Sequence, residues 1–441
     1  MRKTWGLLFT MLLSGTSFAQ LNDNKPEDAL IVYKIQAGDT LSQLSRKYLK
    51  QPTDLQAIRH LNHLRSIDVL PTGDFLKIPR LSVKQRPSQA TIISLSCART
   101  IAAGTPPQPM SVGSVLTEGA IIDIPAECHI AMLLEDGSVI RLPSSAAMKI
   151  ATLRKNALES SPEVRLDLVK GRVELEVYKR RAQATPFEVR TPLSMTGVRG
   201  TEFRVGYDPT EQAGQVEVLG GVVQAMGMSD TKSSAVKKGQ GVPFDSSGKA
   251  LPIEQLLSAP AFEQAEPANS TLAAYNIKLI GNSQAKHYAA ISAKSANFLG
   301  SHESQIMRTP EITTSNLTSS VTFYQFTAVS KAGLVGEPRQ YGFCTSQPEV
   351  KAGRCSAVFD APMSENVMIK FSLIRHSQGG IQELVSTQKL QARNGQFTID
   401  GLPSGQYKWD MSYGTSQPSA NSTITKQSGS FDLIALTAVT P

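Results

Sequence analysis

The chain has 441 residues, which excludes a fold built around one hydrophobic core and predicts about three domains at ~150 residues each, or more if some are small. About half of its formal charge of +8 at pH 7 lies in residues 20–90, and the much longer remainder after residue 90 is close to neutral. A basic amino-terminal part suits a polyanionic partner or a solvated surface.

The first 19 residues have the features of a secretory signal peptide. Two basic residues precede an apolar run from Trp5 to Leu13, and small residues lead up to Ala19. We expect cleavage before Gln20. The apolar run is too short to span a bilayer and no comparable run follows, so we expect an exported protein without a transmembrane segment. Export disfavours nucleic acid as the partner of the basic region, and we expect none.

The four cysteines are expected to form disulfides, because an exported chain meets an oxidising compartment. Three connectivities are open. Proximity in the sequence favours pairing Cys97 with Cys128 and Cys344 with Cys355. Neither pair has the spacing of a thiol redox motif or a zinc site.

Residues 30–80 have the pattern of a small strand–helix–helix–strand module. An alternation of apolar and polar residues ends at Gly38, which permits a tight turn. Thr40 followed by Gln43 predicts a capped helix. Thr53 followed by Gln56 predicts a second capped helix, with Asn62 as a left-handed end residue. A strand before Pro79 closes the module.

This module resembles the lysin-motif (LysM) domain family. The residues that carry the resemblance are Gly38-Asp39-Thr40-Leu41, Tyr48, Leu55, Ile58, Asn62, Leu70, Gly73, Leu76, Ile78 and Pro79. The resemblance implies binding to N-acetylglucosamine-containing glycans such as peptidoglycan, in a shallow groove between the loop after the first strand and the loop before the second.

The residues of these two loops suit such a ligand. Backbone amides between Gly38 and Leu41 are placed to face an acetamido carbonyl, while Leu41 and Ile67 offer apolar contact to its methyl group. The candidate glycan-binding residues are Gly38, Asp39, Thr40, Leu41, Asn62, Arg65 and Ile67. Thr40 as a simple helix cap and Asn62 as a simple helix terminator are the structural alternatives.

A linker over residues 81–90 is expected to lead into an all-β domain over residues 91–245. Three segments predict hairpins, with turns at Asp136-Gly137, Lys170-Gly171 and Gly220-Gly221. Helical periodicity is almost absent, which favours a β-roll or β-sandwich. Glu174 and Glu176 share one strand face and are expected to face solvent.

This second region resembles the periplasmic FecR-type domain. The segments that carry the resemblance are Asp136-Gly137-Ser138, Leu168 to Val173, Phe187 to Pro192, Gly197 to Phe203, Val216 to Gly221 and Gly239-Gln240-Gly241. The family name comes from a regulator of a sigma factor at the inner membrane. That role needs a membrane span before the β domain, so here the resemblance implies a scaffold or a protein-docking surface.

After a second linker over residues 246–265, β character resumes. Two divergent copies of one sandwich are expected at residues 266–348 and 349–438, and they resemble fibronectin type III or immunoglobulin-like domains. Trp409 is expected in the second core rather than in a binding site. The predicted fold is therefore multidomain and mainly β, with one small βααβ module at its start.

No catalytic constellation is found in the sequence. His60 and His63 form the only close histidine pair, and no zinc-ligand spacing occurs. Ser234 to Lys237 fits a loose Ser-x-x-Lys pattern, but its companion motifs are absent and we treat it as chance. We expect no catalytic residues, no bound metal and no cofactor.

The sequence therefore predicts a non-catalytic periplasmic protein that binds peptidoglycan and presents β domains to a protein partner of the envelope. An envelope-signalling component, whose FecR-like domain senses an outer-membrane partner, is the alternative. A cell-wall hydrolase without recognisable motifs is a weaker one.

Overall fold

The computed structural model describes the chain except for residues 1–29, 52, 68, 97–99, 102–107, 127, 160, 181–186, 269–273, 299–301, 315–316, 347–354, 362–366, 377–381, 392–394, 416–424 and 438–441. The expected signal peptide and Cys97 therefore lie outside the described residues. The chain divides into two compact units, Met1–Val83 and Lys84–Pro441. No described helix is long and apolar enough to cross a membrane.

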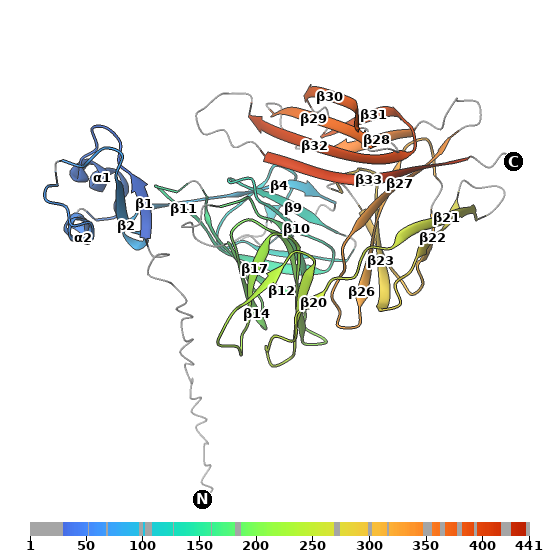
Figure 1. Cartoon of the computed structure of the whole chain (residues 1–441), viewed down its shortest axis with the longest axis horizontal. Coiled ribbons are helices and arrows are strands. Elements are labelled where there is room, and N and C mark those ends of the chain that lie inside the picture. The colour runs from blue at the N-terminus through green and yellow to red at the C-terminus, as the bar shows by residue number, and fades with distance from the viewer. Residues whose placement is uncertain are drawn as a thin grey trace, which may run out of the picture. The chain divides into compact units, whose positions relative to one another are not determined.

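The first unit has the predicted strand–helix–helix–strand order (Figure 1). Its elements are β1 (Leu30–Lys34), α1 (Leu41–Tyr48), α2 (Asp54–Leu61), β2 (Phe75–Pro79) and the 3-10 turn η1 (Arg80–Ser82). β1 and β2 pair in antiparallel register, with Ile31 opposite Ile78. Apolar side chains from both strands and both helices are buried together, and they form a small core.

The two helices of this unit begin differently. Thr40 caps α1 as predicted, because its side chain accepts a hydrogen bond from the Gln43 amide at 3.2 Å. The capping box predicted for α2 is wrong. Thr53 has a helical backbone and makes no side-chain cap; its hydroxyl instead donates to Gln51 at 3.4 Å.

The end of α2 also differs from its prediction. Asn62 has φ −102°, whereas His63 takes the left-handed conformation with φ 51°. The His63 amide donates to the His60 carbonyl and the Leu64 amide to the Arg59 carbonyl, at 3.2 and 3.1 Å. This pattern is a Schellman motif with its left-handed residue one position later than expected.

The second unit begins with a sixteen-stranded all-β arrangement, which confirms the predicted roll or sandwich. Its strands are β3 (Gln85–Pro87), β4 (Ala90–Leu95), β7 (Val115–Leu116), β8 (Ile121–Ile124), β9 (Ile130–Leu134), β10 (Val139–Leu142), β11 (Ala146–Asn156), β12 (Glu163–Glu176), β13 (Phe187–Arg190), β14 (Ser194–Val198), β15 (Glu202–Asp208), β16 (Ala213–Gly220), β17 (Val222–Gly227), β18 (Ser234–Lys237), β19 (Gln240–Phe244) and β20 (Glu254–Gln255). A separate pair joins β5 (Thr100–Ile101) and β6 (Gln108–Pro109).

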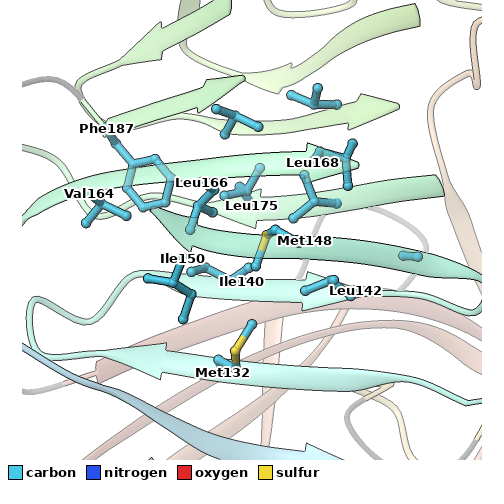
Figure 2. Close-up of a cluster of buried hydrophobic side chains, with 14 of the residues drawn as sticks. Met132, Ile140, Leu142, Met148, Ile150, Val164, Leu166, Leu168, Leu175 and Phe187 are labelled. Atoms are coloured by element: carbon cyan, nitrogen blue, oxygen red, sulfur yellow. The ribbon is translucent and has the colours of Figure 1, made fainter. Parts of the chain in front are cut away.

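One large core holds this β domain together. Side chains from β9 to β13 point into a common apolar layer (Figure 2). Among them, Ile140, Met148, Leu166 and Phe187 have no exposed surface. Burying each such side chain stabilises the fold by roughly 1.5–3 kcal/mol before the entropy cost of ordering it.

Of the three predicted hairpins, the one at Asp136-Gly137 is confirmed. β9 and β10 pair in antiparallel register, and Gly137 has φ 88°. Asp136 does not have positive φ, so the turn is longer than the predicted two-residue type. Its carboxylate instead forms a buried ion pair with Arg180 at 2.8 Å.

The hairpin predicted at Lys170-Gly171 is wrong, because β12 runs through both residues as one strand of 14 residues. Its first half pairs with β11 and β13, and its second half pairs with β10 and β15. Gly171 has φ 81°, and a Cβ there would lie 2.5 Å from the Ser145 carbonyl oxygen. This glycine therefore marks a bend and a close backbone approach rather than a reversal.

The hairpin predicted at Gly220-Gly221 is also wrong. β16 pairs with β15 and β19, whereas β17 pairs with β14 and β18. Gly221 has φ 83° and lies against the Thr201 side chain. The two glycines therefore carry the chain from one group of strands to another.

Two β-sandwiches follow, and they complete the predicted fold class. Their strands are β21 (Ala261–Pro267), β22 (Tyr275–Ile280), β23 (Ala285–Ala293), β24 (His302–Met307), β25 (Glu311–Thr313), β26 (Thr322–Ser330), β27 (Arg339–Ser346), β28 (Cys355–Asp360), β29 (Val367–His376), β30 (Gln382–Gln391), β31 (Gln396–Leu402), β32 (Gly405–Thr415) and β33 (Thr425–Thr437). β27 and β33 pair in parallel, so the two sandwiches share one eight-stranded sheet (Figure 1).

Strands also occupy both segments that were expected to be linkers. β3 lies within residues 81–90 and pairs with β11. β20 and the start of β21 lie within residues 246–265, and β21 pairs with β22. The division of residues 84–441 into three domains remains a proposal, because this stretch forms a single compact unit.

The disulfide between Cys344 and Cys355 is formed, as proximity predicted. It links β27 to β28 and therefore joins the two sandwiches. Cys128 is also disulfide-bonded. Its expected partner Cys97 is outside the described residues. Closing the short Cys344–Cys355 loop stabilises the fold by about 3 kcal/mol in the chain-entropy account.

A row of charged side chains crosses one face of β10, β12, β15 and β16. Arg141 lies opposite Glu174, Glu174 opposite Arg204, and Arg204 opposite Glu217. Glu174 and Glu176 are both only partly exposed, rather than fully solvent-facing as expected, and the Glu176 side chain remains 43% exposed. The face that carries them is covered by the sandwich region, whose backbone carbonyls accept hydrogen bonds from Arg204.

Candidate functional site

The candidate site is the loop between β1 and α1, together with the loop between α2 and β2. Gly38 has φ 85° and is exposed, and a Cβ built there would meet no heavy atom within 4 Å. Glycine is therefore favoured here by the positive φ angle of the backbone and not by a lack of room for a side chain. The Asp39 amide donates to the Gln36 carbonyl at 3.1 Å, which closes the turn.

Asp39 holds this turn in shape. Its Oδ2 accepts hydrogen bonds from the Tyr33 hydroxyl at 2.8 Å and from the Gln36 amide at 2.7 Å. Burial and the Asp39 carboxylate raise the pKa of Tyr33 to about 12. The carboxylate is therefore engaged within the module.

A backbone hydrogen bond ties the two loops together. The Leu41 amide donates to the Ile67 carbonyl at 2.9 Å. The Leu41 side chain is 1% exposed and belongs to the core, so it does not offer the expected apolar contact to a ligand. Ile67 is partly exposed and remains the apolar candidate of the pair.

The donors that this loop leaves for a ligand are the amides of Gly38 and Thr40. Within the described part of the chain, no hydrogen bond engages either N–H. Gly38 is exposed and Thr40 partly exposed. A turn that leaves two amide donors, on either side of Asp39, without a partner in the protein is suited to binding a neutral carbonyl oxygen.

Asn62 is a structural residue of the module. Its Nδ2 donates to the Ile58 carbonyl at 2.8 Å and to the Lys77 carbonyl at 2.7 Å, and its Oδ1 accepts from the Lys77 amide at 2.7 Å. These bonds join the end of α2 to β2. Both polar atoms of the side chain are thereby occupied within the module.

The remaining candidate, Arg65, is exposed in the same loop as Ile67. Reasoning from the sequence missed Tyr33, because its hydroxyl acts on Asp39 six residues away rather than on an adjacent position. The alternation of Ile31, Tyr33 and Ile35 placed all three side chains on one strand face. It could not show that the tyrosine tip reaches the turn.

The motifs dismissed in the sequence do not assemble into a catalytic site. Ser234 and Lys237 lie at the two ends of β18, three positions apart, so their side chains point to opposite faces of the strand. His60 and His63 are exposed. Among the described residues, no group of three His, Cys, Asp or Glu side chains is arranged to hold a metal ion.

Two family models match the chain. Residues 33–79 match the LysM domain model, and residues 121–224 match the model described as FecR protein. Both resemblances seen in the sequence are therefore confirmed. LysM and FecR domains bind or signal and are not catalytic. None of the curated proteins compared matches the chain.

Solved structures give weaker likenesses. A crystal structure described as an anti-sigma factor from Parabacteroides distasonis has 19% identity and a TM-score of 0.26; the match covers 31% of this chain and 59% of that one. The FN1-FN3 domains of chicken CNTN1 have 10% identity and a TM-score of 0.15, with 70% and 96% covered. Scores this low carry no argument about function.

Proposed function

We propose that the first unit binds N-acetylglucosamine-containing glycan and anchors the chain to peptidoglycan in the periplasm. The observation that carries the proposal is the Gly38–Thr40 turn, whose two unpaired amide donors belong to an exposed and a partly exposed residue within a segment that matches the LysM domain model. The ligand's acetamido carbonyl accepts from these amides, and its methyl group lies against Ile67. Arg65 flanks the same groove.

The fixed geometry of the turn supports this role. Asp39 and the Leu41–Ile67 bond hold both loops in place before a ligand arrives, so little conformational entropy is lost on binding. The module needs no catalytic group for this function. Residues 1–19 act as the cleaved signal peptide that brings it to the envelope.

A sedimentation assay with purified peptidoglycan tests the anchoring role. The chain lacking residues 1–19 is expected to co-sediment, and deletion of residues 30–80 is expected to abolish this. Ile67→Glu places a charge at the apolar contact and should weaken binding by about tenfold or more. Ala57→Glu makes the same kind of change at an exposed position of α2 and should bind as the parent chain does. Equal binding by the deletion variant would refute the anchoring role.

We propose that the β domains serve as a scaffold or docking surface for an envelope protein. The match of residues 121–224 to the FecR model favours one second function, in which this region senses an outer-membrane partner and relays a signal. Overexpression of the chain with and without residues 30–80 separates the two functions. A transcript response that persists without the first unit would favour signalling.

A further inference from the structure

A cavity of about 180 Å³ lies between the charged face of β10, β12 and β15 and one face of the eight-stranded sheet. Its volume corresponds to about six water molecules at ~30 Å³ each. One wall carries neutral polar side chains without partners, and the other carries charged side chains. The cavity is distinct from the candidate site of the first unit.

The sheet wall presents two buried polar side chains without partners. Trp409 on β32 and Gln427 on β33 are 4% and 3% exposed and line the cavity. Among the described residues, Trp409 Nε1 and both polar atoms of Gln427 have no hydrogen-bond partner. Each such group costs about 1–3 kcal/mol when it is left unsatisfied. A polar occupant would remove that cost.

Gly429 shapes this wall. It lies opposite Trp409 in the β32–β33 register, and a Cβ there would come within 2.7–2.9 Å of indole atoms, Nε1 among them. The glycine therefore lets the indole lie across the neighbouring strand. Gln340, whose Oε1 is also buried without a partner, adds a hydrogen-bond acceptor.

The opposite wall carries a surplus of negative charge. Arg141 is paired with Glu176 at 3.7 Å, and Arg204 donates to backbone carbonyls of the sandwich region at 3.2–3.3 Å. Both cations are thus engaged. In the described part of the chain, the carboxylates of Glu174 and Glu202 form no ion pair or hydrogen bond.

Glu202 lies where the cavity meets solvent, since its residue is exposed and it also lines the cavity. Desolvation on the cavity side, and next the charge of Glu176, raise the pKa of its carboxyl group. A positively charged ligand group would offset both effects. No three described carboxylates are arranged to hold a metal ion, which argues for an organic cation.

We propose that this cavity binds a small hydroxylated primary amine, with its ammonium group at Glu202 and Glu174 and its hydroxyl groups at Gln427 and Trp409. Ammonium donors match the unpaired carboxylates. Hydroxyl groups both donate and accept, so they satisfy the indole N–H and the carboxamide together. An amino sugar of one ring, or an amino alcohol, has the appropriate size.

Tryptophan fluorescence provides a local test. The sequence has two tryptophans, so the chain lacking residues 1–19 retains Trp409 alone, and its emission does not report on the first unit. Titration with glucosamine is expected to change the emission in a saturable way. Glucose has the same ring without the ammonium group, and it should bind at least about tenfold more weakly.

Variants at the carboxylates complete the test. Glu202→Gln should weaken glucosamine binding by about tenfold or more, and Glu174→Gln serves if the first variant does not fold. Glu311→Gln alters an exposed glutamate of β25 and should bind as the parent chain does. The proposal is overturned if emission does not respond to glucosamine, if glucose binds equally well, or if folded Glu202→Gln binds unchanged.

Discussion

Asn62 and Lys77 are joined by two hydrogen bonds of 2.7 Å, one from the Lys77 amide to Asn62 Oδ1 and one from Asn62 Nδ2 to the Lys77 carbonyl. A side chain at the end of α2 thus imitates a neighbouring strand for β2. Asn62 Nδ2 also donates a hydrogen bond to the Ile58 carbonyl at 2.8 Å. Asn62 is therefore the connection on which the arrangement of the second loop depends.

Replacing Asn62 by alanine should destabilise the first unit by about 2–3 kcal/mol, since three hydrogen bonds of roughly 1 kcal/mol each are lost. Amide hydrogen exchange in the full chain would show faster exchange across α2 and β2. Arg65→Ala, an exposed change in the adjacent loop, should leave exchange unaltered. Unchanged protection in Asn62→Ala would show that the connection is dispensable.

Gly171 and Gly119 form a matched pair for testing the bend in β12. Both have left-handed φ angles, of 81° and 93°, but only Gly171 lacks room for a Cβ. Gly119→Ala should cost about 1 kcal/mol from backbone strain alone. Gly171→Ala should cost at least about 2 kcal/mol more, because Ser145 and Ala146 must move. Urea unfolding measures both, and equal costs would contradict the close approach.

Arg204 and Glu217 join the FecR-like region to the sandwich region. Arg204 is 4% exposed and donates to the Val335 and Gly336 carbonyls, while Glu217, with no exposed surface, accepts from the Val335 amide at 3.0 Å. Arg204→Met removes the hydrogen bonds to the Val335 and Gly336 carbonyls and a buried positive charge that lies opposite Glu217, and it should destabilise the second unit by about 3–5 kcal/mol.

Limited proteolysis would reveal this loss as faster cleavage near Gly336. The control is Arg190→Met, which removes an arginine paired at 3.0 Å with Glu188 on the exposed surface. Such a pair contributes about 0–1 kcal/mol. If both variants resisted protease equally, the buried arginine would not be what holds the two regions together.

Tyr33 gives the first unit a defined response to alkaline pH. Its pKa is raised from 10.0 to about 12, chiefly by burial and then by the hydrogen bond to Asp39. Below pH 10 the tyrosine is protonated in both the folded and the unfolded chain, so its titration does not change the free energy of unfolding. Between pH 10 and about 12 the unfolded chain loses its proton first, so stability should fall as pH rises through this window.

Tyr33→Phe should abolish that pH dependence, and Asp39→Asn should lower the pKa of Tyr33. Ultraviolet absorbance of the phenolate would measure the tyrosine titration. Loss of the α-helical circular dichroism signal would measure unfolding of the first unit as pH rises. Titration of Tyr33 at its ordinary value would contradict the hydrogen bond to Asp39.

The sequence was informative where the partners are close along the chain. The Thr40 cap bonds three residues away, and the Asp136-Gly137 turn joins adjacent strands. The errors arose where a partner lies far away. The backbone of Gly171 lies close to the Ser145 carbonyl, and the spacing of apolar residues in β12 cannot reveal this approach.

The cavity between the charged face of β10, β12 and β15 and the eight-stranded sheet shows the same limit more strongly. The alternation in β12 correctly placed Glu174 and Glu176 on one face, opposite the core. The residues that lie across the cavity from this face, such as Trp409 and Gln427, come more than 200 positions later in the sequence. A charged strand face reads as solvent-exposed unless a covering element is known.

The most direct test of the glycan-binding account is an amide chemical-shift titration of the isotopically labelled chain with chito-oligosaccharides. The account predicts saturable shifts at the Gly38 and Thr40 amides and at Ile67, with the Asn62 side-chain amide still bonded to Lys77. Unperturbed Gly38 and Thr40 amides at saturating oligosaccharide, in a chain whose first unit is folded, would contradict it.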